Sequence, residues 1–127
     1  MPRVLVVEDE AIAAMAICLM LESMDCTVIG SAARGQEAID LAYKLHPDLV
    51  LMDIRLKGEM SGIESAKIIQ ARLHIPVIFT TAYSADEIRE RCDINGRCLF
   101  ITKPIKEDVL AQAISAACGP GKPDEPG

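Results

Sequence analysis

The chain has 127 residues, of which half are apolar and a quarter are charged, as expected for one ordinary globular domain. Its net charge of -6 and the lack of a basic stripe argue against nonspecific binding to nucleic acid or to anionic lipid. The sequence has no apolar run close to the roughly 20 residues of a membrane span, and its N-terminus lacks a signal-peptide pattern. We therefore expect a cytoplasmic domain that contacts neither a membrane nor nucleic acid directly.

Patterns typical of a strand followed by a helix alternate five times along the chain. Strict alternation of this kind predicts an α/β fold, in which five helices wind a five-stranded parallel sheet into three layers, as in flavodoxin-like proteins. The chain is too short for a barrel, which needs about twice its length. The predicted strands are Val4 to Val7, Thr27 to Gly30, Leu49 to Met52, Val77 to Phe79 and Leu99 to Ile101.

The helix expected after the first strand repeats apolar residues at i, i+3, i+4 and i+7. This spacing, at Ile12, Met15, Ala16 and Leu19, predicts the helix.

Two later segments are less regular. Ser84 and Glu87 form a capping-box pattern for a fourth helix, but its apolar edge is thin, so we expect it to be the least firmly held helix. Residues 119–127 contain three prolines and three glycines, which indicates a flexible tail or the start of a linker after a domain of residues 1–118.

The apolar run Leu49 to Met52 ends abruptly at Asp53, which indicates a strand buried on both faces that meets solvent at a carboxylate. In an open parallel sheet, ligands bind at the carboxyl ends of the strands. Asp53 is therefore placed for chemistry, although an Asp in this position also serves as a turn initiator or helix cap.

Other polar residues follow the neighbouring predicted strands and are expected to meet Asp53 at the same edge: Glu8, Asp9, Thr80, Thr81 and Lys103. Carboxylates this close repel one another by about 4 kcal/mol per pair at 4 Å and an effective dielectric of about 20. A hard divalent cation such as Mg²⁺ is suited to these oxygen ligands, and Lys103 would add a second positive charge. Taken singly, the acids also fit helix caps and the threonines fit ordinary strand residues, whereas Lys103 gains little from packing. Pro104 after it favours a cis peptide bond.

The chemistry that follows is phosphoryl transfer. Asp53 could attack phosphorus as a nucleophile and form an aspartyl phosphate. Mg²⁺ and Lys103 would stabilise charge on the transferring oxygens, and a threonine hydroxyl could donate a hydrogen bond to one of them.

Four motifs resemble the receiver domains of two-component response regulators over about residues 3–117: Val6-Val7-Glu8-Asp9-Glu10, Leu51-Met52-Asp53, Thr81-Ala82 and Ile101-Thr102-Lys103-Pro104. The resemblance implies that Asp53 is the phosphoacceptor and that Thr81 and Lys103 assist it. It implies that Mg²⁺ binds to Glu8, Asp9, Asp53 and the backbone carbonyl of Arg55. It also implies a sensor histidine kinase or phosphotransfer protein as the phosphodonor.

Phe100 lies at the position of the family's aromatic switch, although an aromatic residue on a last strand also fits a core role. If it switches, phosphate draws Thr81 inward and the Phe100 ring turns into the vacated space. The face formed by the helix from Ser84, the strand from Leu99 and the last helix would then change shape. A partner, or a second copy in a homodimer, would read that face.

The sequence departs from the family's usual pattern after Asp53, because the loop has no proline and reaches its glycine, Gly62, one residue late. We expect a more mobile loop. Arg55 and Tyr83 lie where the resemblance implies tuning of dephosphorylation, and their bulk predicts a long-lived phosphoryl group.

The sequence also bears on three other functions. A dehalogenase-type phosphatase would need a second Asp at position 55, which is Arg55, and a flavodoxin-like nucleotide site would need a phosphate loop where Glu8 to Glu10 lie. A receiver-like interaction module that works without phosphorylation remains the alternative. The protein would catalyse its own phosphorylation and dephosphorylation, but as a signalling switch and not as a metabolic enzyme.

Overall fold

The computed structural model describes residues 2–56, 58, 60–82 and 99–118. The predicted helix from Ser84, its capping partner Glu87, Tyr83 and the expected tail of residues 119–127 lie outside the described residues. In chain order, the elements are β1 (Arg3–Val7), α1 (Ala11–Ser23), β2 (Thr27–Ala32), α2 (Gly35–Leu45), β3 (Leu49–Asp53), α3 (Gly62–Leu73), β4 (Val77–Thr81), β5 (Leu99–Thr102) and α5 (Glu107–Cys118).

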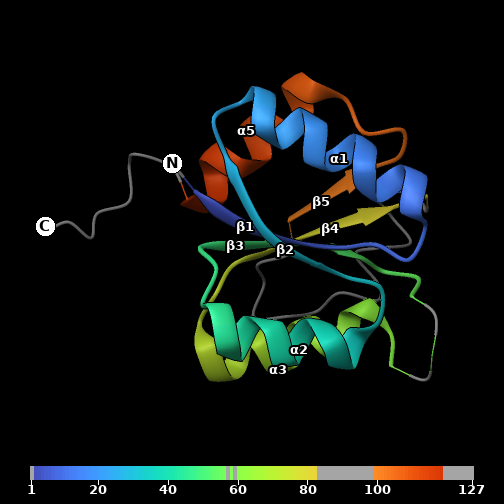
Figure 1. Ribbon diagram of the computed structural model, residues 1–127, viewed down its shortest axis with the longest axis vertical. Coiled ribbons are helices and arrows are strands. Elements are labelled where there is room, and N and C mark those ends of the chain that lie inside the picture. The colour runs from blue at the N-terminus through green and yellow to red at the C-terminus, as the bar shows by residue number, and fades with distance from the viewer. Residues whose placement is uncertain (1, 57, 59, 83–98, 119–127) are drawn as a thin grey trace, which may run out of the picture.

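The strands form one parallel sheet in the order β2-β1-β3-β4-β5. Helices α1 and α5 cover one face of the sheet, and α2 and α3 cover the other (Figure 1). The predicted three-layer, doubly wound α/β fold is therefore confirmed, with four of the five predicted helices within the described part of the chain. None of these helices combines the length and the apolar character needed to cross a membrane.

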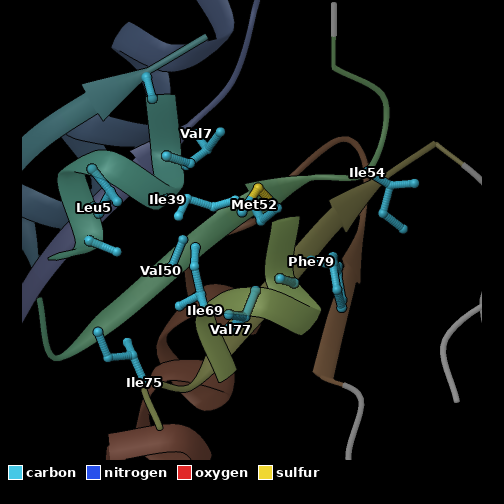
Figure 2. Packing of buried hydrophobic residues seen from close by; sticks show 14 residues of the cluster. Leu5, Val7, Ile39, Val50, Met52, Ile54, Ile69, Ile75, Val77 and Phe79 are labelled. Atoms are coloured by element: carbon cyan, nitrogen blue, oxygen red, sulfur yellow. The ribbon is translucent and has the colours of Figure 1, made fainter. Parts of the chain in front are cut away.

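Strand β3 is buried along its whole length because it lies in the middle of the sheet between two helical layers. Successive side chains of a strand point to opposite faces, so Val50 and Met52 join the core beneath α2 and α3, whereas Leu51 joins the core beneath α1 and α5. Figure 2 shows the first of these cores, in which Ile39 of α2 and Ile69 of α3 lie against the strands. This packing holds β3 rigidly up to its last residue, Asp53.

The predicted helix α1 is present, but the apolar residues whose spacing predicts it do not form its buried face. Ile12, Met15 and Leu19 are 84%, 63% and 61% exposed, and Ala16 is exposed as well. Helix α1 buries Ile17 and Leu21 instead. The physical reason is that Ala11 to Leu21 contains no charged residue, so apolar side chains lie on every side of the helix and spacing alone cannot select the buried face.

The loop after β3 is closed where α3 begins. The backbone N–H of Gly62 donates a hydrogen bond to the carbonyl of Ile54 (3.0 Å). Ser61 and Glu64 form a capping box, in which the Ser61 Oγ accepts from the Glu64 N–H (3.1 Å) and the Glu64 carboxylate accepts from the Ser61 N–H (2.9 Å). A hydrogen bond therefore joins the two ends of the loop. The expected mobility of the loop remains a prediction.

Gly62 tolerates no side chain in this arrangement. A Cβ at this position would overlap the backbone oxygen of Asp53 and lie 2.9 Å from the Ile54 Cα. We predict that Gly62→Ala lowers the free energy of unfolding by about 1–3 kcal/mol, measured by urea denaturation, because backbone atoms must move to relieve the overlap.

The matched control is Gly30→Ala, whose Cβ would meet side-chain ends and no backbone, namely Leu45 at 3.1 Å and Leu5 at 3.5 Å. We expect a clearly smaller loss of stability in this variant. Equal losses in the two variants would contradict the assignment of a special backbone contact to Gly62.

Candidate functional site

The site lies at the carboxyl edge of the sheet, where three neighbouring parallel strands end together. Asp53 is the last residue of β3 and is paired in register with Thr80 of β4. Glu8 and Asp9 directly follow β1, whose last residue is paired with Met52. The sheet topology therefore brings together carboxylates that are more than 40 residues apart in the sequence.

The three predicted carboxylates do converge. Glu8, Asp9 and Asp53 each offer an oxygen atom, and these atoms all lie within 4.8 Å of one another. Glu8 and Asp53 are only 4% and 5% exposed, whereas Asp9 is half-buried. A carboxylate cluster with so little access to water needs nearby positive charge.

Lys103 supplies one such charge. Its Nζ lies 3.1 Å from Asp53 Oδ2 and 3.3 Å from Glu8 Oε1, so one ammonium group bridges two carboxylates. Burial alone would lower the pKa of Lys103, but its contacts with Asp53 and Glu8 outweigh burial and raise the pKa. Lys103 therefore stays cationic.

One lysine does not neutralise three carboxylates, and the pKa of Glu8 reflects the negative charge that remains. Burial, together with a hydrogen bond to Asp53 and the negative charge of Asp53, raises the pKa of Glu8 from 4.5 to about 7. Glu8 therefore holds a proton under conditions in which an exposed glutamate would be ionised. This proton partly compensates for the missing positive charge.

Backbone amides fix two of the carboxylates in place, a feature that sequence reasoning missed. The N–H of Arg55 donates to Asp53 Oδ1 (3.0 Å), and the N–H of Glu10 donates to Glu8 Oε2 (3.2 Å). Both donors lie two residues after the carboxylate that they bind. Short-range bonds of this kind are common for acidic residues at turns, and the sequence signal for them is only the position of the acid at a strand end.

The donor set fits a magnesium ion. Three carboxylates offer hard oxygen ligands, and Mg²⁺ is bound in proteins through one or two carboxylates together with waters and phosphate oxygens. The excess negative charge around Glu8 gives a physical reason for a divalent cation at this edge. The predicted ligand role of the Arg55 carbonyl remains a prediction.

The predicted switch residues lie on β4 and β5, which follow β3 in the order of the sheet. Thr81 is the buried last residue of β4, and its carbonyl accepts a hydrogen bond of 2.7 Å from the Lys103 N–H. Phe100 of β5 is paired in register with Phe79 and is partly buried against the core beneath α2 and α3. The peptide bond between Lys103 and Pro104 is cis. Thr81 is thus linked to Lys103 through the backbone, and the switching roles of Thr81 and Phe100 remain predictions.

Fold and site together define a doubly wound α/β domain with an acidic, lysine-bridged centre at the carboxyl edge of its sheet. A family model described as the response regulator receiver domain matches residues 4–115. The chain therefore belongs to the response regulator receiver domain family, whose members are signalling switches in two-component systems.

Individual relatives agree with this assignment. The chain is 36% identical over 115 residues to the transcriptional regulatory protein PdtaR of Mycobacterium tuberculosis, covering 91% of this chain and 56% of that protein. It is 35% identical over 119 residues to the polar-differentiation response regulator DivK of Brucella ovis, covering 91% and 95% of the two chains. The chain thus spans just over half of PdtaR but nearly all of DivK.

A solved structure shows the same fold. The signal receiver domain of a modulated diguanylate cyclase from Desulfovibrio desulfuricans G20 is similar with a TM-score of 0.84 and 35% sequence identity, covering 93% of this chain and 94% of that one.

The raised pKa of Glu8 predicts a specific pH dependence of stability. Between pH 4.5 and about 7, folded Glu8 keeps a proton that the unfolded chain releases, so its contribution to stability falls as the pH rises and is lost above about 7. We predict that, without metal, the free energy of unfolding of the wild type falls more steeply across this window than that of Glu8→Gln. Urea denaturation at a series of pH values measures the difference.

Mg²⁺ should oppose this trend, because a divalent cation stabilises the ionised form of Glu8. We therefore expect added Mg²⁺ to raise the stability of the wild type most at the upper end of the window. Identical pH profiles for the wild type and Glu8→Gln would contradict the electrostatic account of the cluster.

Proposed function

We propose that this protein is a phosphoacceptor receiver domain in which Asp53 accepts a phosphoryl group from a histidine kinase or a phosphotransfer protein. The observation that carries the proposal is the convergence of Asp53 with Glu8, Asp9 and the Lys103 ammonium group at one buried edge. Membership of the receiver family supports the same role.

The proposed reaction transfers phosphorus from nitrogen to oxygen. An oxygen of Asp53 attacks phosphorus, the bond to the donor histidine breaks, and the imidazole leaves with the bonding electron pair and takes up a proton. Lys103 contacts Asp53 and is placed to pair with an oxygen of the incoming phosphoryl group. Bound Mg²⁺, held by Glu8, Asp9, Asp53 and the Arg55 carbonyl, would supply charge neutralisation during transfer.

The readout is proposed to involve Thr81 and Phe100. A phosphoryl group on Asp53 adds negative charge and acceptor oxygens beside the end of β4. Because the Lys103 N–H is bonded to the Thr81 carbonyl, movement at the end of β4 is passed to β5. The surface around β5 and α5 then changes for a partner or a second copy. The predicted helix from Ser84 would belong to that surface.

The first experiment is intact-mass analysis after incubation with acetyl phosphate, with and without Mg²⁺. We predict one phosphoryl adduct on the wild type with Mg²⁺ and none on Asp53→Asn, because the amide lacks the nucleophilic carboxylate. Asp40→Asn, which makes the same change on the exposed face of α2, should react like the wild type. No adduct on folded wild type that binds Mg²⁺ would favour an interaction module that works without phosphorylation.

The bulky residues Arg55 and Tyr83 should also set the lifetime of the phosphoryl group. Arg55 is exposed next to Asp53, so its side chain can obstruct an attacking water. We predict that Arg55→Ala and Tyr83→Ala each speed the loss of phosphate several-fold, followed by intact mass after acetyl phosphate is removed. Rapid loss from the wild type, unchanged in both variants, would refute this tuning role.

A further inference from the structure

A cavity of about 480 Å³ lies on the α2 and α3 side of the sheet, where these two helices run side by side (Figure 1). The walls of this α2–α3 cavity are the start of α2, the loop after β3 and the first half of α3. Its volume lies in the range of about 300–1,000 Å³ that is usual for small-molecule sites. Neither the acidic cluster nor Lys103 belongs to its described lining, so a ligand here does not depend on the proposed function.

Two glycines bring the walls of the α2–α3 cavity close together. A Cβ at Gly35 would lie 3.0 Å from the Met60 Cγ, and a Cβ at Gly58 would lie 3.2 Å from the Arg34 Nη1. The Met60 side chain therefore covers the start of α2, and the Arg34 guanidinium reaches back over the loop. The buried Ser65 Oγ donates a hydrogen bond of 3.0 Å to the Gly35 carbonyl and joins α3 to α2. Packed elements thus hold the cavity in shape.

The α2–α3 cavity presents two opposite charges that do not pair with each other. Within the described part of the chain, the Arg34 guanidinium forms no hydrogen bond or ion pair. The Glu64 carboxylate accepts one hydrogen bond, from the Ser61 N–H to its Oε1 (2.9 Å), which fixes the side chain at the start of α3. One free cation and one oriented anion therefore line the same cavity.

Apolar side chains complete the lining. Met60 and Ile68 are partly buried against the core beneath α2 and α3, and both line the α2–α3 cavity. A ligand that complements all three features carries a carboxylate for Arg34, an ammonium group for Glu64 and an apolar side chain. A simple carboxylic acid would leave Glu64 without a partner, and a simple amine would leave Arg34 without one. The combination of the three groups is that of an apolar α-amino acid.

We propose that the α2–α3 cavity binds a free apolar α-amino acid. Its carboxylate pairs with the Arg34 guanidinium, its ammonium group pairs with the Glu64 carboxylate, and its side chain packs on Met60 and Ile68.

The test is a titration of the full chain with three probes, L-leucine, isocaproate and isoamylamine. Isocaproate has the leucine side chain and carboxylate without the ammonium group, and isoamylamine has the side chain and ammonium group without the carboxylate. Binding is followed by NMR of ¹³C-labelled methionine methyl groups. Met60 lines the cavity and is the reporter, whereas Met15 is exposed on α1 and is the reference. The two signals are identified by their loss in Met60→Leu and Met15→Leu.

We expect L-leucine to shift the Met60 signal with a dissociation constant of about 10 mM or tighter and to leave the Met15 signal in place. Each analogue should bind at least about threefold more weakly, because it lacks one of the two charge-assisted contacts.

Two variants test each charge separately. Arg34→Gln should remove the preference for L-leucine over isoamylamine, and Glu64→Gln should remove the preference over isocaproate. Glutamine at position 64 still accepts the hydrogen bond from the Ser61 N–H, so the capping box is kept. The matched control is Arg72→Gln, which removes an exposed charge at the end of α3 outside the described lining and should bind all three probes like the wild type.

Three results would each overturn the proposal: no saturable shift of the Met60 signal by L-leucine, equal affinity for the three probes, or equal losses in Arg34→Gln and Arg72→Gln. An equal shift of the Met15 signal would show nonspecific binding and would overturn it as well. None of these results bears on phosphoryl transfer to Asp53, which intact-mass analysis tests separately.

Discussion

The repulsion among Glu8, Asp9 and Asp53 is the constraint on which the rest of the structure depends. Three carboxylates share a site in which two are almost fully buried, and the only described cation within contact distance is Lys103. The site responds by bridging two acids with one ammonium group and by raising the pKa of Glu8 to about 7. Such a centre attracts further positive charge, and the protonation of Glu8 shifts when the charges around it change.

The fold holds this unfavourable arrangement in place by packing. Strand β3 has a helical layer on each face and contributes side chains to both cores, so Asp53 cannot withdraw from its neighbours. Gly62 allows α3 to begin against the backbone of Asp53 and Ile54, and the capping box of Ser61 and Glu64 completes that junction. The stability of the two cores therefore offsets the electrostatic cost of the site.

Local backbone bonds and long-range topology have different roles at the site. The amides of Arg55 and Glu10 orient the carboxylates that lie two residues before them, whereas the parallel sheet sets the distances between carboxylates from different strands. The bond between Thr81 and Lys103 joins β4 to β5 at the same edge. A change in the charge of Asp53, at the end of β3, therefore also affects the ends of β4 and β5.

Much of the fold and of the candidate site could be predicted from the sequence. The alternation of strand and helix patterns is a local property, and parallel strands necessarily place Glu8, Asp9, Asp53 and Lys103 at one edge. The closing bond between Gly62 and Ile54 and the capping box of Ser61 and Glu64 were not anticipated.

The sequence by itself determined which polar residues lie at the carboxyl ends of strands, because periodicity and strand ends are encoded locally. The strand order that brings them together was decided by the tertiary structure. Only the tertiary structure decided which side of α1 is buried, because its residues are apolar all around and the choice depends on what the sheet and α5 leave uncovered. Only the tertiary structure decided the protonation of Glu8 as well, because the pKa depends on burial and on charges that arrive from distant parts of the chain.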